Sequence, residues 1–315
     1  MEKKTKYPKK NPIYLTCYTI RFKNQNGFIK IKDVFAPKNF KEEMSDFMTQ
    51  YLGLTYENPE GNRILHLVQS LSLQSNLVSG VMKRGHNGQE TDIEELVDGK
   101  AKTVNTVKYD QYNSIHFYFL ICSPNEDSNY LIFMAQTYKQ YGFKDIFVQS
   151  YKEYIRLKFG DDNLNCSINP LSIPQLFSNY LKKGDIRKLR FQKHTLSKNL
   201  ENVIGESDNQ NVKDYEVELT VRAKKKGFNR IKNIDFDTTK LVEVFDFGFE
   251  YDEAYADISL NGRERSINIT HPEKFVATFD ITDRVMLDSA TNRPIYSELN
   301  KEAIAILKEE ILINL

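Results

Sequence analysis

The chain has 315 residues, of which 40% are hydrophobic, and its formal net charge is +1. This length favours two domains or one elaborated domain, and the apolar content excludes a chain that is disordered throughout. A net charge this close to zero excludes a general attraction to nucleic acid or to an anionic membrane, so any such attraction must be local.

Three cysteines, Cys17, Cys122 and Cys166, lie far apart in apolar stretches of the sequence. Their number and spacing argue against a disulfide framework or a zinc site and predict buried thiols in a reducing cytoplasm. No apolar run is long enough to cross a membrane, and the basic N-terminal segment is not followed by the hydrophobic region of a secretory signal. We therefore expect a cytoplasmic protein without membrane insertion.

The first predicted elements are a β-hairpin and a helix. Ile13–Phe22 and Phe28–Phe35 alternate apolar and polar residues around a turn that contains Gly27. In Phe40–Tyr51 apolar residues recur at every third or fourth position, which predicts an amphipathic helix capped near Asn39. Its apolar side is expected to cover the hairpin.

Beyond this helix the sequence predicts a series of strands. The two most apolar, Ser114–Cys122 and Asn129–Ala135, are expected at the centre of a sheet covered on both faces, with His116 as a satisfied core residue. A short acidic helix is predicted near Asp92–Val97. The other predicted strands are Ile64–Leu73, Ala101–Tyr109 and Leu164–Ile168.

The segment Asn76–Gly88 contains three glycines, together with Lys83, Arg84 and His86. A glycine-rich loop of this kind can present backbone N–H groups to a phosphate. The spacing matches neither a P-loop nor a dinucleotide-binding fingerprint, however. We therefore favour an ordinary hairpin turn and keep the ligand loop as an alternative.

Two helices are predicted in the middle of the chain. Gly142–Phe159 has an aromatic stripe at helical spacing, which indicates a face packed on a sheet rather than a platform for stacking bases. Pro174–Leu181 begins with a proline that suits the first helical turn, and Gly184 suits its C-terminal cap.

The stretch Lys182–His194 is the most concentrated group of basic residues with a possible function, because it contains six basic residues and one acidic residue, Asp185. Strand alternation places Lys188 and Arg190 on one side and Arg187 with Lys193 on the other. Charge on both sides predicts an edge strand or a strand with an exposed face.

The remaining chain is predicted to form a smaller unit behind the polar linker Gly205–Asn211. Asn261-Gly262 is the strongest short-range hairpin signal, since this pair suits a two-residue turn. The predicted elements here are strands at Val212–Ala223, Ala254–Leu260, Arg263–Thr270 and Phe275–Thr282, and a closing helix at Ser297–Leu312. A short helix is predicted before the linker, at Leu196–Ile204.

Together these elements predict an α+β fold with mostly antiparallel sheets, helices packed on one face and a C-terminal helix that closes the chain. The predicted domains are a β-rich α+β domain at residues 1–204 and a smaller domain with β-hairpins and the C-terminal helix at residues 212–315.

Charge is segregated within the second half of the chain. Lys182–Lys232 contains 14 basic and 7 acidic residues, whereas Asn233–Asp257 contains one basic and eight acidic residues. A protein of near-zero net charge can therefore still present a basic face.

The sequence lacks the common catalytic patterns: no GxSxG or HExxH motif occurs, and the five histidines are isolated. A Mg²⁺-dependent nuclease is an alternative because Asp214, Glu216 and Glu218 lie close together, but the lysine that such a site needs two residues after the last carboxylate is replaced by Thr220. We predict no catalytic residue, no metal ligand and no cofactor.

Binding to a DNA or RNA backbone is the favoured function, because basic residues alternate with Phe191 and Phe228 as in surfaces that contact phosphates and stack bases. The candidate nucleic-acid-binding residues are Lys182, Lys183, Arg187, Lys188, Arg190, Lys193, Lys224, Lys225, Lys226 and Arg230.

The run KKGDIRKLRF with the preceding PQLFSNYL resembles uncharacterised bacterial proteins encoded near restriction and phage-defence genes. The resemblance covers about a third of the chain and carries no active site with it. It implies a cytoplasmic bacterial accessory protein that acts on or senses foreign nucleic acid in antiviral defence.

A protein–protein interaction module is the main alternative. In it the acidic segment 235–257 pairs with the basic strands, either within the chain or between the subunits of a homo-oligomer or complex.

Overall fold

The computed structural model describes residues 11–125, 127–138, 141–160, 164–194, 217–222, 251–260 and 262–315. Contacts divide the chain into two compact units: Met1–Leu171 with Ile281–Leu307, and Ser172–Asp280 with Lys308–Leu315. The predicted linker Gly205–Asn211 lies outside the described residues, so the division into residues 1–204 and 212–315 stays a prediction.

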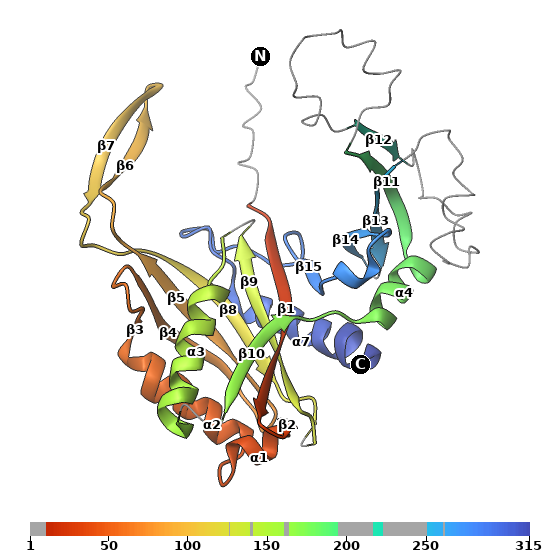
Figure 1. Cartoon of the computed structure of the whole chain (residues 1–315). Coiled ribbons are helices and arrows are strands. Elements are labelled where there is room, and N and C mark those ends of the chain that lie inside the picture. The colour runs from red at the N-terminus through yellow and green to blue at the C-terminus, as the bar shows by residue number, and fades with distance from the viewer. Residues whose placement is uncertain are drawn as a thin grey trace, which may run out of the picture. The chain divides into compact units, whose positions relative to one another are not determined.

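An antiparallel sheet forms the body of the first unit (Figure 1). Its strands run in the order β10-β1-β9-β8-β5-β4-β3, and the short β2 pairs with β1. The bounds are β1 Ile13–Asn24, β2 Gly27–Phe28, β3 Tyr56–Glu57, β4 Arg63–Leu73, β5 Leu77–His86, β8 Asn113–Cys122, β9 Tyr130–Tyr138 and β10 Asn165–Pro170.

Helices cover both faces of this sheet. On one face lie α1 (Ile31–Phe35), α2 (Phe40–Asp46) with a π-helical turn at Phe47–Tyr51 and a 3₁₀ turn at Leu52–Leu54, and α3 (Lys144–Phe159). The other face is covered by α7 (Tyr296–Ile306), where Asn300 Oδ1 accepts hydrogen bonds from Ser79 Oγ at 2.7 Å and from the Tyr118 hydroxyl at 2.9 Å.

The core between the sheet and α1–α3 is built largely from phenylalanine and tyrosine rings. Phe147 stacks on Phe133 with ring centroids 4.3 Å apart and on Tyr151 at 5.8 Å, while Phe47 meets Tyr151 edge-on at 4.8 Å. The apolar spacing of α3 and of the π-helical turn places Phe147, Tyr151 and Phe47 on the sides that face the sheet. The predicted aromatic stripe of α3 is therefore a packing surface, as the sequence indicates.

A two-stranded arm continues from the first unit, formed by β6 (Thr91–Val97) and β7 (Lys100–Val107). Figure 1 shows it extending beyond the ends of β5 and β8. Every residue of β6 is exposed, and within the described residues the two strands pair only with each other.

The second unit contains a four-stranded sheet in the order β12-β11-β13-β14 with α4 packed on it. β11 is therefore an inner strand. The bounds are α4 Pro174–Lys183, β11 Asp185–Lys193, β12 Val217–Arg222, β13 Glu253–Leu260 and β14 Arg263–Asn268, followed by a 3₁₀ turn at Pro272–Lys274 and β15 Thr278–Asp280.

Buried polar contacts secure the last residues of the chain within this second unit. Glu310 is buried and forms an ion pair with the buried Arg263, and the Tyr180 hydroxyl donates to its Oε2 at 2.9 Å. After α7, the chain ends with a π-helical turn at Leu307–Ile311 and a 3₁₀ turn at Leu312–Asn314.

The predicted α+β class with antiparallel sheets and a C-terminal helix is confirmed. The Asn39 capping box at the start of α2 is present, and the three cysteines are buried free thiols. None of the described helices is both long and apolar enough to cross a membrane.

Four predicted elements differ from the structure, and one of them, the hairpin turn expected at Asn76–Gly88, is mostly the strand β5. Asp92–Val97 is the strand β6 instead of a helix, because it pairs with β7 along its whole length. Most of Phe28–Phe35 is the helix α1, and only Thr278–Asp280 of Phe275–Thr282 is a strand. The predicted helix Leu196–Ile204 lies outside the described residues.

Candidate functional site

The sheet of the first unit opens between β8 and β9. β9 pairs with β1 along its full length, from Tyr130 to Tyr138, but its ladder with β8 covers only four residue pairs and ends at Phe119 and Ala135. One residue further, the Oε1 atom of buried Gln136 accepts the Tyr118 backbone N–H at 2.7 Å. A side chain thus replaces the next main-chain bond at this point.

The first half of β8 consequently has a free side, which we call the β8 edge and define as Asn113–Tyr118. Backbone groups of alternate strand residues point the same way, so Ser114 and His116 direct their N–H and C=O groups to the side where Tyr118 meets Gln136. β8 has no register shift against β5, so this alternation is unbroken. No strand of the described chain pairs with the β8 edge on this side.

Two hollows flank the β8 edge, one on each face of the strand. Hollow 1 has a volume of about 350 Å³ and contacts Asn113, Ile115 and Phe117; hollow 2 has about 330 Å³ and contacts Ser114, Ile115 and His116. Tyr141 lines both. Successive residues of one strand therefore face different hollows, with the exposed Ile115 between them.

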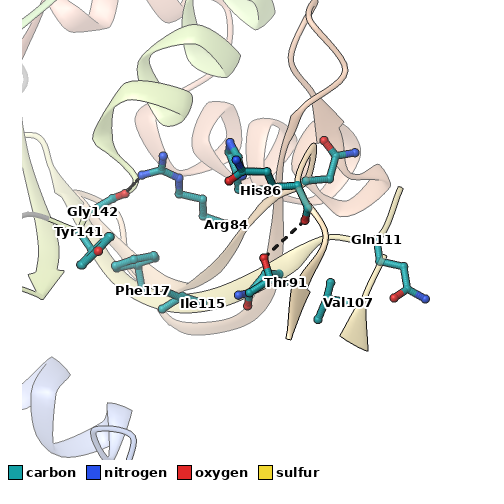
Figure 2. A pocket seen from close by; sticks show the side chains of 12 residues that line it. Arg84, His86, Thr91, Val107, Gln111, Ile115, Phe117, Tyr141 and Gly142 are labelled. Carbon is teal, nitrogen blue, oxygen red and sulfur yellow. Dashed lines mark hydrogen bonds between the residues drawn. The ribbon is translucent and has the colours of Figure 1, made fainter. Parts of the chain in front are cut away.

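A turn and the base of the arm complete the walls. Tyr138 and Tyr141 exchange backbone hydrogen bonds of 2.7 and 2.8 Å, and this turn places Tyr141 beside the β8 edge. Figure 2 shows Tyr141, Phe117 and Ile115 grouped near Arg84, with Thr91 and Val107 of the arm farther along hollow 1.

The charged side chains around the hollows are cationic. Arg84 lines hollow 1, donates to the Gly142 carbonyl and lies 3.5 Å from Asp145, while the exposed Arg293 lines hollow 2. His86 is exposed in hollow 1. Among the described residues that line either hollow there is no aspartate or glutamate. An occupant with negative side chains therefore meets no carboxylate among the described residues that line the hollows.

His116 is half-buried beside Lys83 on the face of hollow 2, and its Nδ1 atom has no hydrogen-bond partner in the described part of the chain. Burial, followed by the charges of Arg293 and Lys83, lowers its pKa. Burial and Lys83 also lower the pKa of His66 on the neighbouring strand. The Nδ1 atom of His116 is thus buried without a hydrogen-bond partner among the described residues, and the prediction of a satisfied core histidine is wrong.

This geometry suits the addition of a strand. An extended chain placed along the β8 edge could bond to the free main-chain groups of Ser114 and His116, and its alternate side chains would enter hollow 1 and hollow 2 in turn. Among the described residues, no group of three or more His, Cys, Asp or Glu side chains could hold a metal ion.

The residues predicted to bind nucleic acid lie mainly on β11, in the second unit. A bulge at Arg187 separates Ile186 from Lys188 in the pairing with β13, so Ile186 joins Leu189 and Phe191 on the buried side. The regular alternation expected from the sequence is therefore wrong at this point. The face that carries Lys188 is partly exposed, as predicted, although β11 is not an edge strand.

Lys188 and Arg190 face a carboxylate of the acidic segment. Asp257 lies directly opposite Lys188 on β13, 3.9 Å from its ammonium and 3.5 Å from the Arg190 guanidinium. Arg190 also donates to Ser266 Oγ at 2.7 Å and covers the Tyr255 ring.

The other predicted positions are less enclosed or not described. Lys182, Lys183 and Arg187 are exposed, and Lys193 is half-exposed. Outside the described residues lie Lys224, Lys225, Lys226 and Arg230, as do Asp214 and Glu216 of the nuclease alternative.

The candidate site thus differs from the predicted one. The segment Asn76–Gly88 is mostly β5 and forms neither of the expected loops. Its Gly80 is needed for packing, since an added Cβ would lie 2.5 Å from the Gln69 carbonyl oxygen.

The β8 edge could have been detected in the sequence from the polar start of β8, where Asn113, Ser114 and His116 interrupt an otherwise apolar strand.

A comparison with known protein families and with curated proteins finds no match to this chain.

Proposed function

We propose that this protein is a binding module that captures an extended, acidic polypeptide segment as an additional strand along the β8 edge. The observation that carries the proposal is the free strand edge with a hollow on each face. Main-chain bonds would supply affinity without regard to sequence, and the hollows would select alternate side chains.

The acidic character of the ligand follows from the walls. Arg293 is exposed in hollow 2, and Arg84, which also pairs with Asp145, lines hollow 1. Among the described residues no carboxylate lines either hollow, and six lining residues carry side-chain amides that can hydrogen-bond to carboxylates or to a peptide backbone. A basic segment would be repelled, so the charge pattern gives the module its selectivity.

Fluorescence anisotropy with a labelled peptide of alternating threonine and glutamate tests the proposal. We expect saturable binding of this peptide and none of the matched threonine–lysine peptide. Equal binding of both peptides, or binding of neither, would contradict the proposed selectivity or the module itself.

A pair of variants at one position tests the strand geometry. Ser114→Pro removes an N–H that points to the free side and leaves the β5 ladder intact, whereas Ser114→Ala keeps this N–H. We expect affinity to fall about tenfold in Ser114→Pro relative to Ser114→Ala, the cost of one main-chain hydrogen bond. Equal affinities would exclude pairing at the β8 edge.

Contact with a phosphate backbone is a second candidate function, supported by the exposed cations at the junction of α4 and β11. A low-salt mobility shift with single- and double-stranded DNA and RNA tests it. Charge reversal to glutamate at Lys182, Lys183 and Arg187 should abolish retention, whereas the same reversal at the exposed Lys23, Lys41 and Lys108 should not. Retention by the first variant would rule this surface out.

A further inference from the structure

The arm is the most exposed regular element in the described chain. β6 and β7 form a ribbon whose two outer edges are unpaired among the described residues. Isolated two-stranded ribbons are at best marginally stable in water, and unpaired edges favour pairing with another chain.

One face of the arm leads into hollow 1. The register places Thr91, Ile93, Glu95 and Val97 of β6 on one face, and their partners on β7 are Val107, Asn105, Lys102 and Lys100. Ile93 is 46% exposed and Val97 is 43% exposed, while Thr91 and Val107 line hollow 1 at the base of the arm. A molecule that entered hollow 1 could therefore continue along this face and cover the exposed Ile93 and Val97.

β6 itself has the properties required of the ligand. It is extended and fully exposed, and the segment Glu90–Asp98 contains five acidic residues and no basic one. Its seven residues span about 23 Å, close to the length of the six-residue β8 edge, about 20 Å.

We propose that the acidic strand comes from a second copy of this chain, so that β6 of one protomer adds to the β8 edge of its partner and the exchange is reciprocal. This inference rests on the proposed function of the β8 edge. Because one chain carries both the acidic strand and the acid-free edge, a two-fold symmetric pair satisfies both sites and closes the assembly. The exposed Ile93 and Val97 of both arms become covered in the same step.

Size-exclusion chromatography with light scattering tests the partner. We expect twice the 36.8 kDa chain mass for the wild type and for Ser114→Ala, and a shift towards the single-chain mass for Ser114→Pro. A wild type that stays at the single-chain mass at high protein concentration, or a Ser114→Pro variant as dimeric as Ser114→Ala, overturns the inference.

A charge swap gives an independent test with folded variants. The edge variant His86→Glu/Arg293→Glu has an acidic edge and an acidic arm, and the arm variant Asp92→Lys/Glu94→Lys/Glu95→Lys has a basic edge and a basic arm. All five positions are exposed. Each variant alone should be monomeric, and mixing the two should restore the dimer mass. No restoration on mixing overturns the reciprocal exchange.

A free peptide separates this inference from the proposed function. A synthetic peptide of residues Gln89–Asp98 that binds a monomeric wild type, and binds Ser114→Pro about tenfold more weakly, supports the module but excludes the second copy as its partner. If the wild type is a dimer, and if neither this peptide nor the threonine–glutamate peptide binds to it or dissociates it, both proposals are contradicted.

Discussion

Tyr151 shows how a single buried hydroxyl can cost stability. Its ring lies in the centre of the aromatic core, fully buried, and its hydroxyl has no hydrogen-bond partner among the described residues. Burial raises the pKa of Tyr151 well above its usual value of 10.0. The unfolded chain releases this proton above pH 10, whereas the folded chain keeps it. The free energy of unfolding is therefore independent of this proton below pH 10 and falls as the pH rises above 10.

We therefore expect Tyr151→Phe to raise the free energy of unfolding by about 1 kcal/mol at pH 7 and to make the loss of stability above pH 10 shallower. Denaturant titrations at several pH values measure both. Tyr180→Phe is the matched control, because the Tyr180 hydroxyl donates to Glu310 at 2.9 Å. This variant should lose about 1 kcal/mol, and a loss of the same size in Tyr151→Phe would contradict the prediction.

Glu43 is a buried carboxylate whose charge is stabilised by two neighbouring side chains. It forms an ion pair with Lys158 and accepts a hydrogen bond from the Tyr154 hydroxyl at 2.7 Å. Lys158→Met leaves a buried charge without its counter-ion and should lower the free energy of unfolding by about 3 kcal/mol. In the double variant Glu43→Gln/Lys158→Met the buried charge is gone, so the free energy of unfolding should fall less in this variant than in Lys158→Met. A double variant as unstable as Lys158→Met would exclude this electrostatic cause.

At the scale of elements, β5 can lie between β4 and β8 only because of its glycines. An added Cβ at Gly80 would lie 2.9 Å from the Phe119 ring and still closer to the backbone of β4. Gly80→Ala should lower the free energy of unfolding by about 2 kcal/mol. Gly53→Ala is the control, because its added Cβ would meet only the Met48 carbonyl oxygen at 3.8 Å; we expect a change within about 0.5 kcal/mol. Similar melting temperatures for the two variants would contradict this.

Elements with local signals could be predicted from the sequence, and those set by tertiary pairing could not. The α2 cap and the α3 stripe are encoded in residue spacing and are confirmed. Asp92–Val97 has too short a pattern to separate helix from strand, and pairing with β7 decides it. The bulge at Arg187 depends on the register with β13. The opening between β8 and β9 depends on where two strands diverge, so the polar residues around His116 were the only local trace of the site.

The whole molecule has a balanced charge, with a sequence pI of about 7.6. Molecules near their isoelectric point repel one another least. We expect solubility to pass through a minimum near pH 7.6, measured by precipitation with polyethylene glycol across a pH series. Solubility that changes steadily through this range would show that local charge asymmetry outweighs net charge.

The burial of Cys17, Cys122 and Cys166 makes this chain convenient for site-specific labelling. Burial raises the pKa of Cys122 and of Cys166 to about 12, so these thiols stay protonated and shielded from maleimide reagents. A cysteine introduced at the exposed Leu96 of the arm can then carry a single fluorophore or spin label with all three native cysteines in place. In the proposed dimer, the distance between the two labels, one on each protomer, would report the separation of the two arms in solution.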